Sequence, residues 1–253
     1  MRIKYNKLLK RGKALFLAYD QGLEHGPIDF NDKNVDPKYI IDIAKKGRYN
    51  AVIFQKGIAE KYNKEIRKSK VPLIIKLNGK TSLGNEAISR ELCTVKEAIK
   101  LGASAVGYTI YIGSEYENIM LQEFEQIQRD AHEKGIPVIA WVYPRGKKVK
   151  ENSKESMAYA ARTGLEIGAD IIKIKYNGKI NDLKWAVKSA GKTKVVIAGG
   201  VKKDKKTLLK QVKEIMDSGA IGLAIGRNVW QDSNPMQVTK EIKKIIWRKC
   251  KRA

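Results

Sequence analysis

The stretch IGADIIKIKYNG, residues 167–178, decides the fold, because its opening phrase recurs along the chain. LGASAVGY (101–108) and SGAIGLAI (218–225) likewise place a glycine and an alanine directly before a short apolar run. In each case a glycine that closes a helical pattern is followed at once by a strand pattern. Repetition of this junction predicts a chain of alternating helices and strands, the arrangement of an α/β protein with a parallel sheet.

Eight apolar runs of strand length divide the chain, and stretches with helical periodicity separate them. The runs are 14–20, 51–55, 71–78, 103–110, 136–144, 169–176, 194–200 and 220–226. Eight strands that alternate with helices predict a (β/α)₈ TIM barrel, with residues 1–253 forming a single catalytic domain. A doubly wound open sheet is the alternative, but no G-x-G-x-x-G phrase follows the first run.

Charge and composition limit the classes of partner. The chain of 253 residues has a formal net charge of +24, which attracts anions of every kind. Most lysines fall in helical or loop stretches such as KKDKKTLLKQVK, which is typical of a solvated basic surface. The sequence contains no helix-turn-helix, zinc-finger or RNP motif that would indicate binding of a specific nucleic acid.

The sequence also contains no run of about 18 apolar residues, the length that a membrane span requires. Two widely spaced cysteines, Cys93 and Cys250, fit a reducing cytoplasm rather than a disulfide scaffold or a zinc site.

Two lysines, Lys173 and Lys175, occur within the sixth apolar run. Residues two apart on a strand share a face, so both are expected to point into the barrel while Ile172 and Ile174 face the helices. Burial beside a second cation disfavours the ammonium form, and a neutral amine can form a Schiff base with a carbonyl. Alternatively, both lysines extend to solvent or pair with carboxylates.

Glycines and an arginine follow the last two runs. Gly199, Gly200 and Gly226 could leave backbone N–H groups free to hold an anion, and Arg227 could add charged hydrogen bonds. Phosphate sites of TIM barrels commonly lie after strands seven and eight. The alternative is that these glycines only make tight turns.

Two further side chains at strand ends could move protons. Tyr143 ends the fifth run, beside the lysine-bearing strand, and could donate or accept a proton. Asp20 ends the first run and could act as a base or as the ion partner of a lysine. Alternatively, Tyr143 only packs as an aromatic side chain, and Asp20 only caps a turn.

Several phrases together resemble a known family. LAYDQGLEHGP (17–27), VYPRG (142–146), ADIIKIKYNG (169–178), AGG (198–200) and IGRNVWQ (225–231) look like those of the archaeal-type class I fructose-1,6-bisphosphate aldolases, the DhnA-like family. The phrases occur in the family's order, on successive expected strands, and the resemblance covers almost the whole chain.

The resemblance implies a TIM barrel that assembles as a homo-oligomer, a decamer of two pentameric rings. The implied reaction is the reversible cleavage of fructose 1,6-bisphosphate, a phosphorylated sugar, to dihydroxyacetone phosphate and glyceraldehyde 3-phosphate, without metal or other cofactor. The residues that match the family's site are Lys173 as the Schiff-base lysine, Tyr143 and Asp20 as catalytic groups, Trp141 and Arg145 as lining groups, and Gly199, Gly200, Gly226 and Arg227 at the phosphate. Lys175 would be a neighbour that adjusts the charge.

Two positions depart from the family pattern. Gln21 stands where many relatives have His, and Ala198 stands where some have Ser. A related transaldolase-like 2-amino-3,7-dideoxy-heptulosonate synthase on the same scaffold remains an alternative, although YDQGLEHGP differs from the MDHGVSNGP-like phrase of such synthases. A basic barrel that binds nucleic acid without catalysis is the other alternative.

Overall fold

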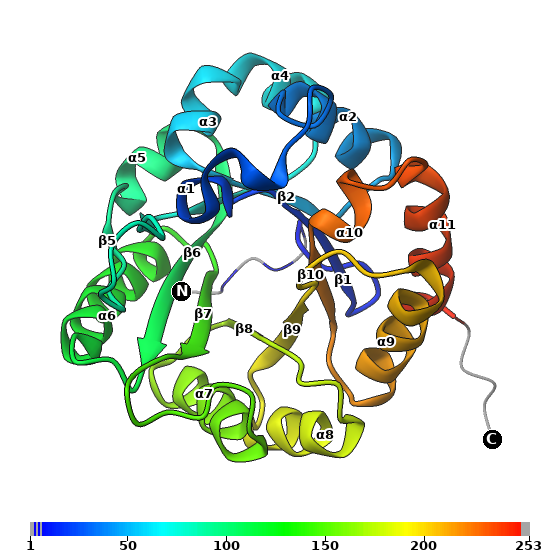
Figure 1. Ribbon diagram of the computed structural model, residues 1–253. Coiled ribbons are helices and arrows are strands. Elements are labelled where there is room, and N and C mark those ends of the chain that lie inside the picture. Colours follow the sequence, from blue (N-terminus) through cyan, green and yellow to red (C-terminus); the bar gives the residue numbers. More distant parts are fainter. Residues whose placement is uncertain (1–2, 4, 6, 249–253) are drawn as a thin grey trace.

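A computed structural model describes residues 3, 5 and 7–248. Its centre is a closed barrel of eight parallel strands, ordered β1-β10-β9-β8-β7-β6-β3-β2 around the ring (Figure 1). The strands are β1 (Ala14–Ala18), β2 (Ala51–Gln55), β3 (Leu73–Lys76), β6 (Ala103–Ile112), β7 (Val138–Pro144), β8 (Ile171–Ile174), β9 (Lys194–Ala198) and β10 (Gly222–Ile225). Each lies within or overlaps one of the eight apolar runs, so the predicted TIM barrel is confirmed. The open-sheet alternative is excluded, because β1 pairs with β10 and closes the ring.

Helices surround the barrel as an outer layer (Figure 1). They are α2 (Pro37–Lys46), α3 (Lys56–Lys61), α4 (Asn63–Ser69), α5 (Val95–Lys100), α6 (Glu117–Glu133), α7 (Lys154–Glu166), α8 (Ile180–Ser189), α9 (Lys205–Asp217) and α11 (Pro235–Ile246). Several begin at a capping side chain: Asp36 accepts from the Lys38 N–H, and Asp204 accepts from the Thr207 N–H. Such caps satisfy backbone donors that have no partner inside the helix.

The barrel wall separates two buried layers. Side chains such as Phe16, Ile53 and Ile171 pack inside the ring, whereas Ile172 and Ile174 pack between the strands and the helices. Successive residues of β8 therefore alternate between the two layers, as the period of a strand requires. This alternation turns Lys173 inward.

A small two-stranded sheet was not expected. The run 71–78 does not continue as one strand: β3 ends at Lys76, and β4 (Asn78–Gly79) pairs antiparallel with β5 (Arg90–Glu91). The buried Asn78 amide donates to the carbonyls of Ser89 and Thr109. Asn78 thereby fixes the loop after β3 against the neighbouring strand β6.

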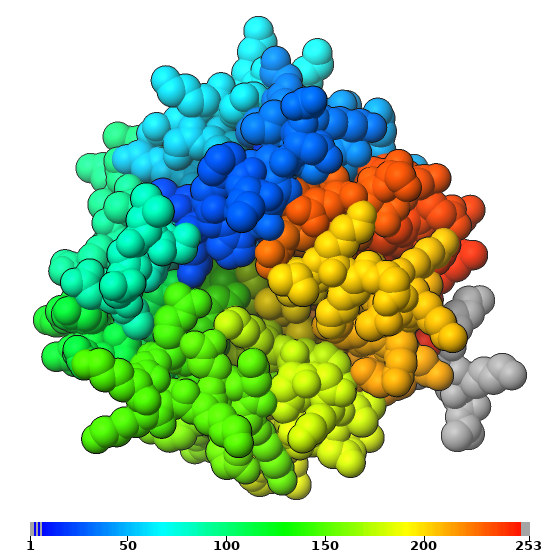
Figure 2. Space-filling view, in the orientation of Figure 1, coloured from blue at the N-terminus to red at the C-terminus, as the bar shows by residue number. Residues whose placement is uncertain are grey.

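Short helices overhang the carboxyl ends of the strands. They are α1 (Gly22–His25) and η1 (Gly26–Asp29) after β1, and α10 (Arg227–Trp230) after β10. The Trp230 indole N–H donates to the Ala18 carbonyl at 3.1 Å, which ties α10 to the first strand. Figure 2, which looks onto this end, shows it hollowed at its centre.

Cys93 is a buried free thiol, and Cys250 lies outside the described residues. Among the helices of the described part, none combines the length and the apolar character that a membrane crossing requires.

Candidate active site

A cavity of about 520 Å³ opens at the carboxyl ends of the strands. Every site residue predicted from the sequence lines it: Asp20, Trp141, Tyr143, Arg145, Lys173, Gly199, Gly200, Gly226 and Arg227. The structure also adds lining side chains that sequence reasoning left without a role, notably Glu24, His25, Lys76 and Lys203. This volume falls in the range of small-molecule sites.

Lys173 is the buried amine of this cavity. It lies on β8, is only 6% exposed, and places Nζ 4.7 Å from the centroid of the Trp141 ring. Burial lowers its pKa from 10.5 to about 8; the charge of Asp20 opposes this shift, and the charge of Lys76 adds to it. At pH 7 roughly one such lysine in ten is neutral, against about one in 3,000 for a lysine of ordinary pKa. The side chain is therefore suited to act as a nucleophile.

Lys175 also lines the cavity, as expected, but it is less buried than Lys173. The strand β8 ends at Ile174, and the Lys175 side chain is 41% exposed, with its Nζ 3.4 Å from the Glu151 carboxylate. Lys175 is thus a partly solvated ion-pair partner beside the buried amine. The cation whose charge lowers the Lys173 pKa is instead Lys76, at the end of β3.

Tyr143 and Asp20 line the same cavity as the amine. Burial raises the pKa of Tyr143 well above its ordinary value, with the charge of Asp20 acting in the same direction. The phenol therefore stays protonated at neutral pH and can donate a proton. Asp20 is 6% exposed, and its Oδ2 lies 4.0 Å from Lys76 Nζ. Asp20 thus lies between two buried lysines, which compensates the burial of its charge.

Arg145 is held by Glu24 on α1 and by Tyr111 on β6. Its Nη1 lies 3.1 Å from Glu24 Oε1, and its guanidinium stacks on the Tyr111 ring at 4.4 Å from the centroid. Burial tends to raise the pKa of Glu24, but the charges of Lys76 and Arg145 outweigh it and keep that pKa below its ordinary value. These contacts fix a cation at the rim of the cavity.

The loops after β9 and β10 are tied together. Asn228 donates its amide hydrogens to the carbonyls of Gly199 and Val201, at 2.9 and 2.8 Å. The Gly199 N–H donates to the Ala224 carbonyl, so it is not free to bind an anion as expected. A Cβ at Gly199 would lie 2.8 Å from Ile225, so a close approach of the two strands explains this glycine. Gly200 has φ +71°, a left-handed turn conformation that favours glycine.

Arg227 is oriented by a chain of charged groups. Its Nη1 lies 3.3 Å from Asp29 Oδ1, and Asp29 Oδ2 lies 2.6 Å from His25 Nδ1. His25 and Asp29 belong to the segment after β1, so these contacts join the ends of the neighbouring strands β1 and β10. The guanidinium keeps further donors for a ligand.

Two buried donors of the cavity lack a partner among the described residues: Trp141 Nε1 and Gln21 Nε2. A buried donor without an acceptor costs free energy, and both nitrogen atoms have almost no exposed surface, so neither is open to a ligand in this conformation. The Trp141 ring fits only because Gly107 lies beside it on β6. A Cβ on Gly107 would come 1.7 Å from the ring atom Cζ3.

Sequence reasoning missed Lys76, Glu24 and Asn228. Lys76 and Glu24 carried a weak signal, since both lie at or just after a strand end, but nothing in the sequence showed which strand-end charges turn inward. Across the residues that the structure describes, no three His, Cys, Asp or Glu side chains gather closely enough to hold a metal ion.

Comparisons with known proteins agree with this geometry. The model of the DeoC/LacD family aldolases matches residues 14–232. The chain is 49% identical to the class 1 fructose-bisphosphate aldolase of Thermoproteus tenax, over 94% of this chain and 91% of the relative. It is 38% identical to a fructose-bisphosphate aldolase/6-deoxy-5-ketofructose 1-phosphate synthase of Methanocaldococcus jannaschii, over 90% and 79% of the two chains.

A solved archaeal fructose-1,6-bisphosphate aldolase, whose catalytic lysine is covalently bound to a carbinolamine intermediate, superposes with a TM-score of 0.90. That structure is 46% identical, and the match covers 96% of this chain and 97% of the other. The barrel, the cavity with its buried amine and these similarities lead to one assignment: the chain belongs to the DeoC/LacD aldolase family and, within it, to the archaeal-type class I fructose-bisphosphate aldolases.

Proposed function

We propose that the chain reversibly cleaves fructose 1,6-bisphosphate to dihydroxyacetone phosphate and glyceraldehyde 3-phosphate, through a Schiff base on Lys173, with residues 1–253 acting as one catalytic domain. The observation that carries the proposal is the buried Lys173 amine, with its pKa lowered to about 8, in a cavity lined by cations. The relatives of similar length that are named for this reaction support the choice of substrate.

The first half of the reaction forms the Schiff base. Neutral Lys173 Nζ adds to the C2 carbonyl of the open-chain sugar and gives a carbinolamine. The protonated Tyr143 phenol donates its proton to the C2 oxygen, and water leaves to give an iminium. The high pKa of Tyr143 suits this role, because the proton is present at neutral pH.

The second half breaks the C3–C4 bond. A base removes the proton of the C4 hydroxyl, and the electrons of the C3–C4 bond move to the iminium, which gives an enamine and glyceraldehyde 3-phosphate. Asp20 and the Tyr143 phenolate formed in the first half are the candidate bases. Protonation of the enamine at C3 and addition of water to the iminium release dihydroxyacetone phosphate and free Lys173.

The two phosphates need cations at both ends of the cavity. Arg227, with the Gly200 turn and Lys203, would hold one phosphate beside the loops of β9 and β10. Arg145 and Lys175 would face the other phosphate from the ends of β7 and β8. Charged hydrogen bonds of this kind are strong, and the guanidinium groups can bind in a bidentate manner.

We also propose a cytoplasmic homo-oligomer, as the family resemblance implies, with a decamer as the expected size. The buried free thiol of Cys93 suits a reducing compartment. Tyr159 on α7 and Trp185 on α8 are 68% and 49% exposed on neighbouring helices, which supports contact with another copy. Light scattering coupled to size-exclusion chromatography tests the size directly.

Borohydride trapping tests the mechanism. The protein is incubated with dihydroxyacetone phosphate, reduced and digested, and the adduct is located by mass spectrometry. We expect the adduct on Lys173 and none in Lys173→Arg, while the matched variant Lys175→Arg keeps it. An adduct on Lys175 would overturn the residue assignment, and no adduct at all would overturn the class I mechanism.

Kinetics then decide the substrate. Cleavage of fructose 1,6-bisphosphate that is lost in Lys173→Arg is the expected result. An adduct on Lys173 without this cleavage would favour a related Schiff-base enzyme, such as the heptulosonate synthase considered from the sequence.

A further inference from the structure

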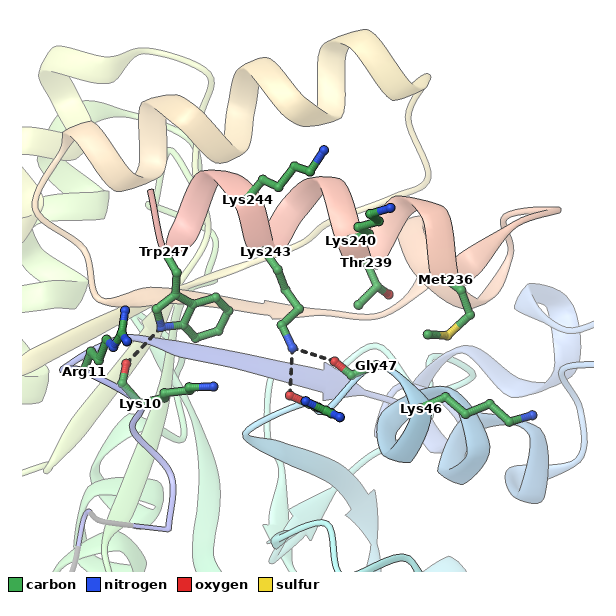
Figure 3. Close-up of a pocket in the computed structure, with 11 residues that line it drawn as sticks. Lys10, Arg11, Lys46, Gly47, Met236, Thr239, Lys240, Lys243, Lys244 and Trp247 are labelled. Carbon is green, nitrogen blue, oxygen red and sulfur yellow. Dashed lines mark hydrogen bonds between the residues drawn. The ribbon is translucent and has the colours of Figure 1, made fainter. Parts of the chain in front are cut away.

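A second cavity, of about 480 Å³, lies at the other end of the barrel from the proposed active site. The segment before β1 and the end of α2 border it on one side, and one face of α11 borders it on the other along the length of that helix (Figure 3). Lys10 precedes β1 and Gly47 precedes β2, so the cavity belongs to the amino ends of the strands. Nothing in the proposed reaction uses these residues.

The lining of this cavity carries charge of one sign. Seven of its eleven residues are cations and none is acidic: Lys10, Arg11, Lys46, Arg48, Lys240, Lys243 and Lys244. Within the described part of the chain, none of the seven has a carboxylate within 4.0 Å. The same helix α11 does pair charges elsewhere, since Glu241 lies 2.6 Å from Lys205. The basic cavity, as defined by these lining residues, is thus a local excess of positive charge that the fold leaves uncompensated.

The floor of the basic cavity is held in place by hydrogen bonds. Lys243 Nζ donates to the carbonyls of Gly47 and Arg48, at 2.7 and 3.1 Å, and so neutralises the carbonyl end of α2 (Figure 3). Trp247 Nε1 donates to the Lys10 carbonyl at 3.0 Å. Burial lowers the pKa of Lys243, and the charges of Lys10 and Arg48 lower it further. An anion bound here would relieve this repulsion.

We propose that the basic cavity binds a small anion with several phosphate groups, of the nucleoside triphosphate type. A multiply charged ligand matches seven cations better than a single carboxylate does, because each phosphate can approach more than one of them. The cavity volume suits a small molecule. The Trp247 ring and Met236 add apolar surface against which a flat base can pack.

Nucleic acid is the competing ligand for a basic surface, but the lining here lacks the stacking aromatics of a nucleic-acid groove. A strand of nucleic acid is normally followed by a groove of cations and stacking aromatics that extends over several nucleotides. The described lining has one aromatic residue, Trp247, so it offers no row of rings on which successive bases could stack. This arrangement favours a compact ligand.

Isothermal titration with ATP and with inorganic tripolyphosphate tests the proposal. The pocket variant is Lys10→Gln, Lys46→Gln and Lys240→Gln, which removes one exposed cation from each bordering segment. Its matched control is Lys96→Gln, Lys100→Gln and Lys213→Gln, which removes the same charge from exposed positions of α5 and α9. Because all six side chains are exposed, both variants are expected to fold.

We expect one site on the wild-type chain and on the control variant, and affinity reduced roughly tenfold or more in the pocket variant. The affinity should also fall as ionic strength rises. Tighter binding of ATP than of tripolyphosphate would show that the base packs against the apolar surface of Trp247 and Met236. Equal binding would show that the site recognises the phosphates alone.

Three results would overturn the proposal: no binding to the wild-type chain, equal weakening in the two variants, or unchanged binding in the pocket variant. A single-stranded RNA 20-mer that binds much more tightly than ATP, with a steep salt dependence, would also overturn it in favour of nucleic acid.

Discussion

Replacement of Lys173 by Met is expected to stabilise the protein at neutral pH while it abolishes Schiff-base formation. Below the folded pKa of about 8, both the folded and the unfolded chain carry a charged Lys173, and the folded chain bears the full cost of burying it. At about 1.4 kcal/mol for each pH unit between 10.5 and about 8, that cost is about 3 kcal/mol at pH 7. Met fills a similar volume without a charge.

The sign of the pH dependence makes the test specific. Between pH 8 and 10.5 the unfolded chain holds the proton that the folded chain has lost, so wild-type stability rises relative to the variant. The free-energy difference between Lys173→Met and wild type should shrink from about 3 kcal/mol at pH 7 to about 1.4 kcal/mol at pH 9.5. Urea unfolding at both pH values, at one protein concentration, measures it.

The matched control is Lys175→Met, whose side chain is 41% exposed. We expect its effect to stay within about 0.5 kcal/mol at both pH values, as for surface substitutions in general. A stabilisation by Lys173→Met that does not change with pH, or no stabilisation at all, would refute the conclusion that burial of the amine lowers its pKa.

Three further predictions concern the same cavity. Tyr143→Phe should lower kcat by about 10²- to 10⁴-fold, the usual loss for a proton-transfer group, and an unchanged kcat in steady-state assays would remove Tyr143 from the mechanism. Lys76→Met should raise the pKa of Lys173, because a neighbouring cation is lost. The rising limb of the pH profile of kcat/KM should then move from near pH 8 to higher pH. A limb that stays near pH 8 would contradict a role of Lys76 in lowering the Lys173 pKa. Gly107→Ala should destabilise the protein by about 1–3 kcal/mol, because the new methyl group meets the Trp141 ring, and thermal unfolding at the wild-type Tm would contradict that clash.

The sequence was most informative where a single physical pattern repeated. The Gly-Ala junctions at 102–103, 168–169 and 219–220 marked helix ends and strand starts. The alternation along β8 correctly turned Lys173 inward. Local periodicity decides such features, and it can be read one segment at a time. For the same reason, every predicted site residue was found in one cavity: strand ends in a closed barrel converge.

The sequence was least informative where distant residues decide the outcome. The buried cation that acts on Lys173 is Lys76, three strands away around the ring, rather than its neighbour Lys175. Gly199 was expected to offer its N–H to an anion, but the Ala224 carbonyl takes that hydrogen. Strand period correctly placed Lys175 at the same cavity as Lys173, but it could not show that β8 ends at Ile174 and that the Lys175 side chain is 41% exposed.

The hydrogen bond between Trp247 and the Lys10 carbonyl has a practical consequence for engineering. Because β1 and β10 are neighbours in the ring, Lys10 before β1 and Trp247 after α11 meet beside the seam of the barrel. The described chain before Lys10 continues to the start of β8, where the Tyr5 hydroxyl donates to Asp170, and its Leu8 is buried. A linker for circular permutants must therefore reach from Trp247 to the Tyr5 segment rather than replace it, and new ends then belong in loops at the same end of the barrel. Tags and fusion partners attached near Lys10 or Trp247 would likewise project away from the catalytic mouth, which leaves it open for immobilised or displayed forms of the enzyme.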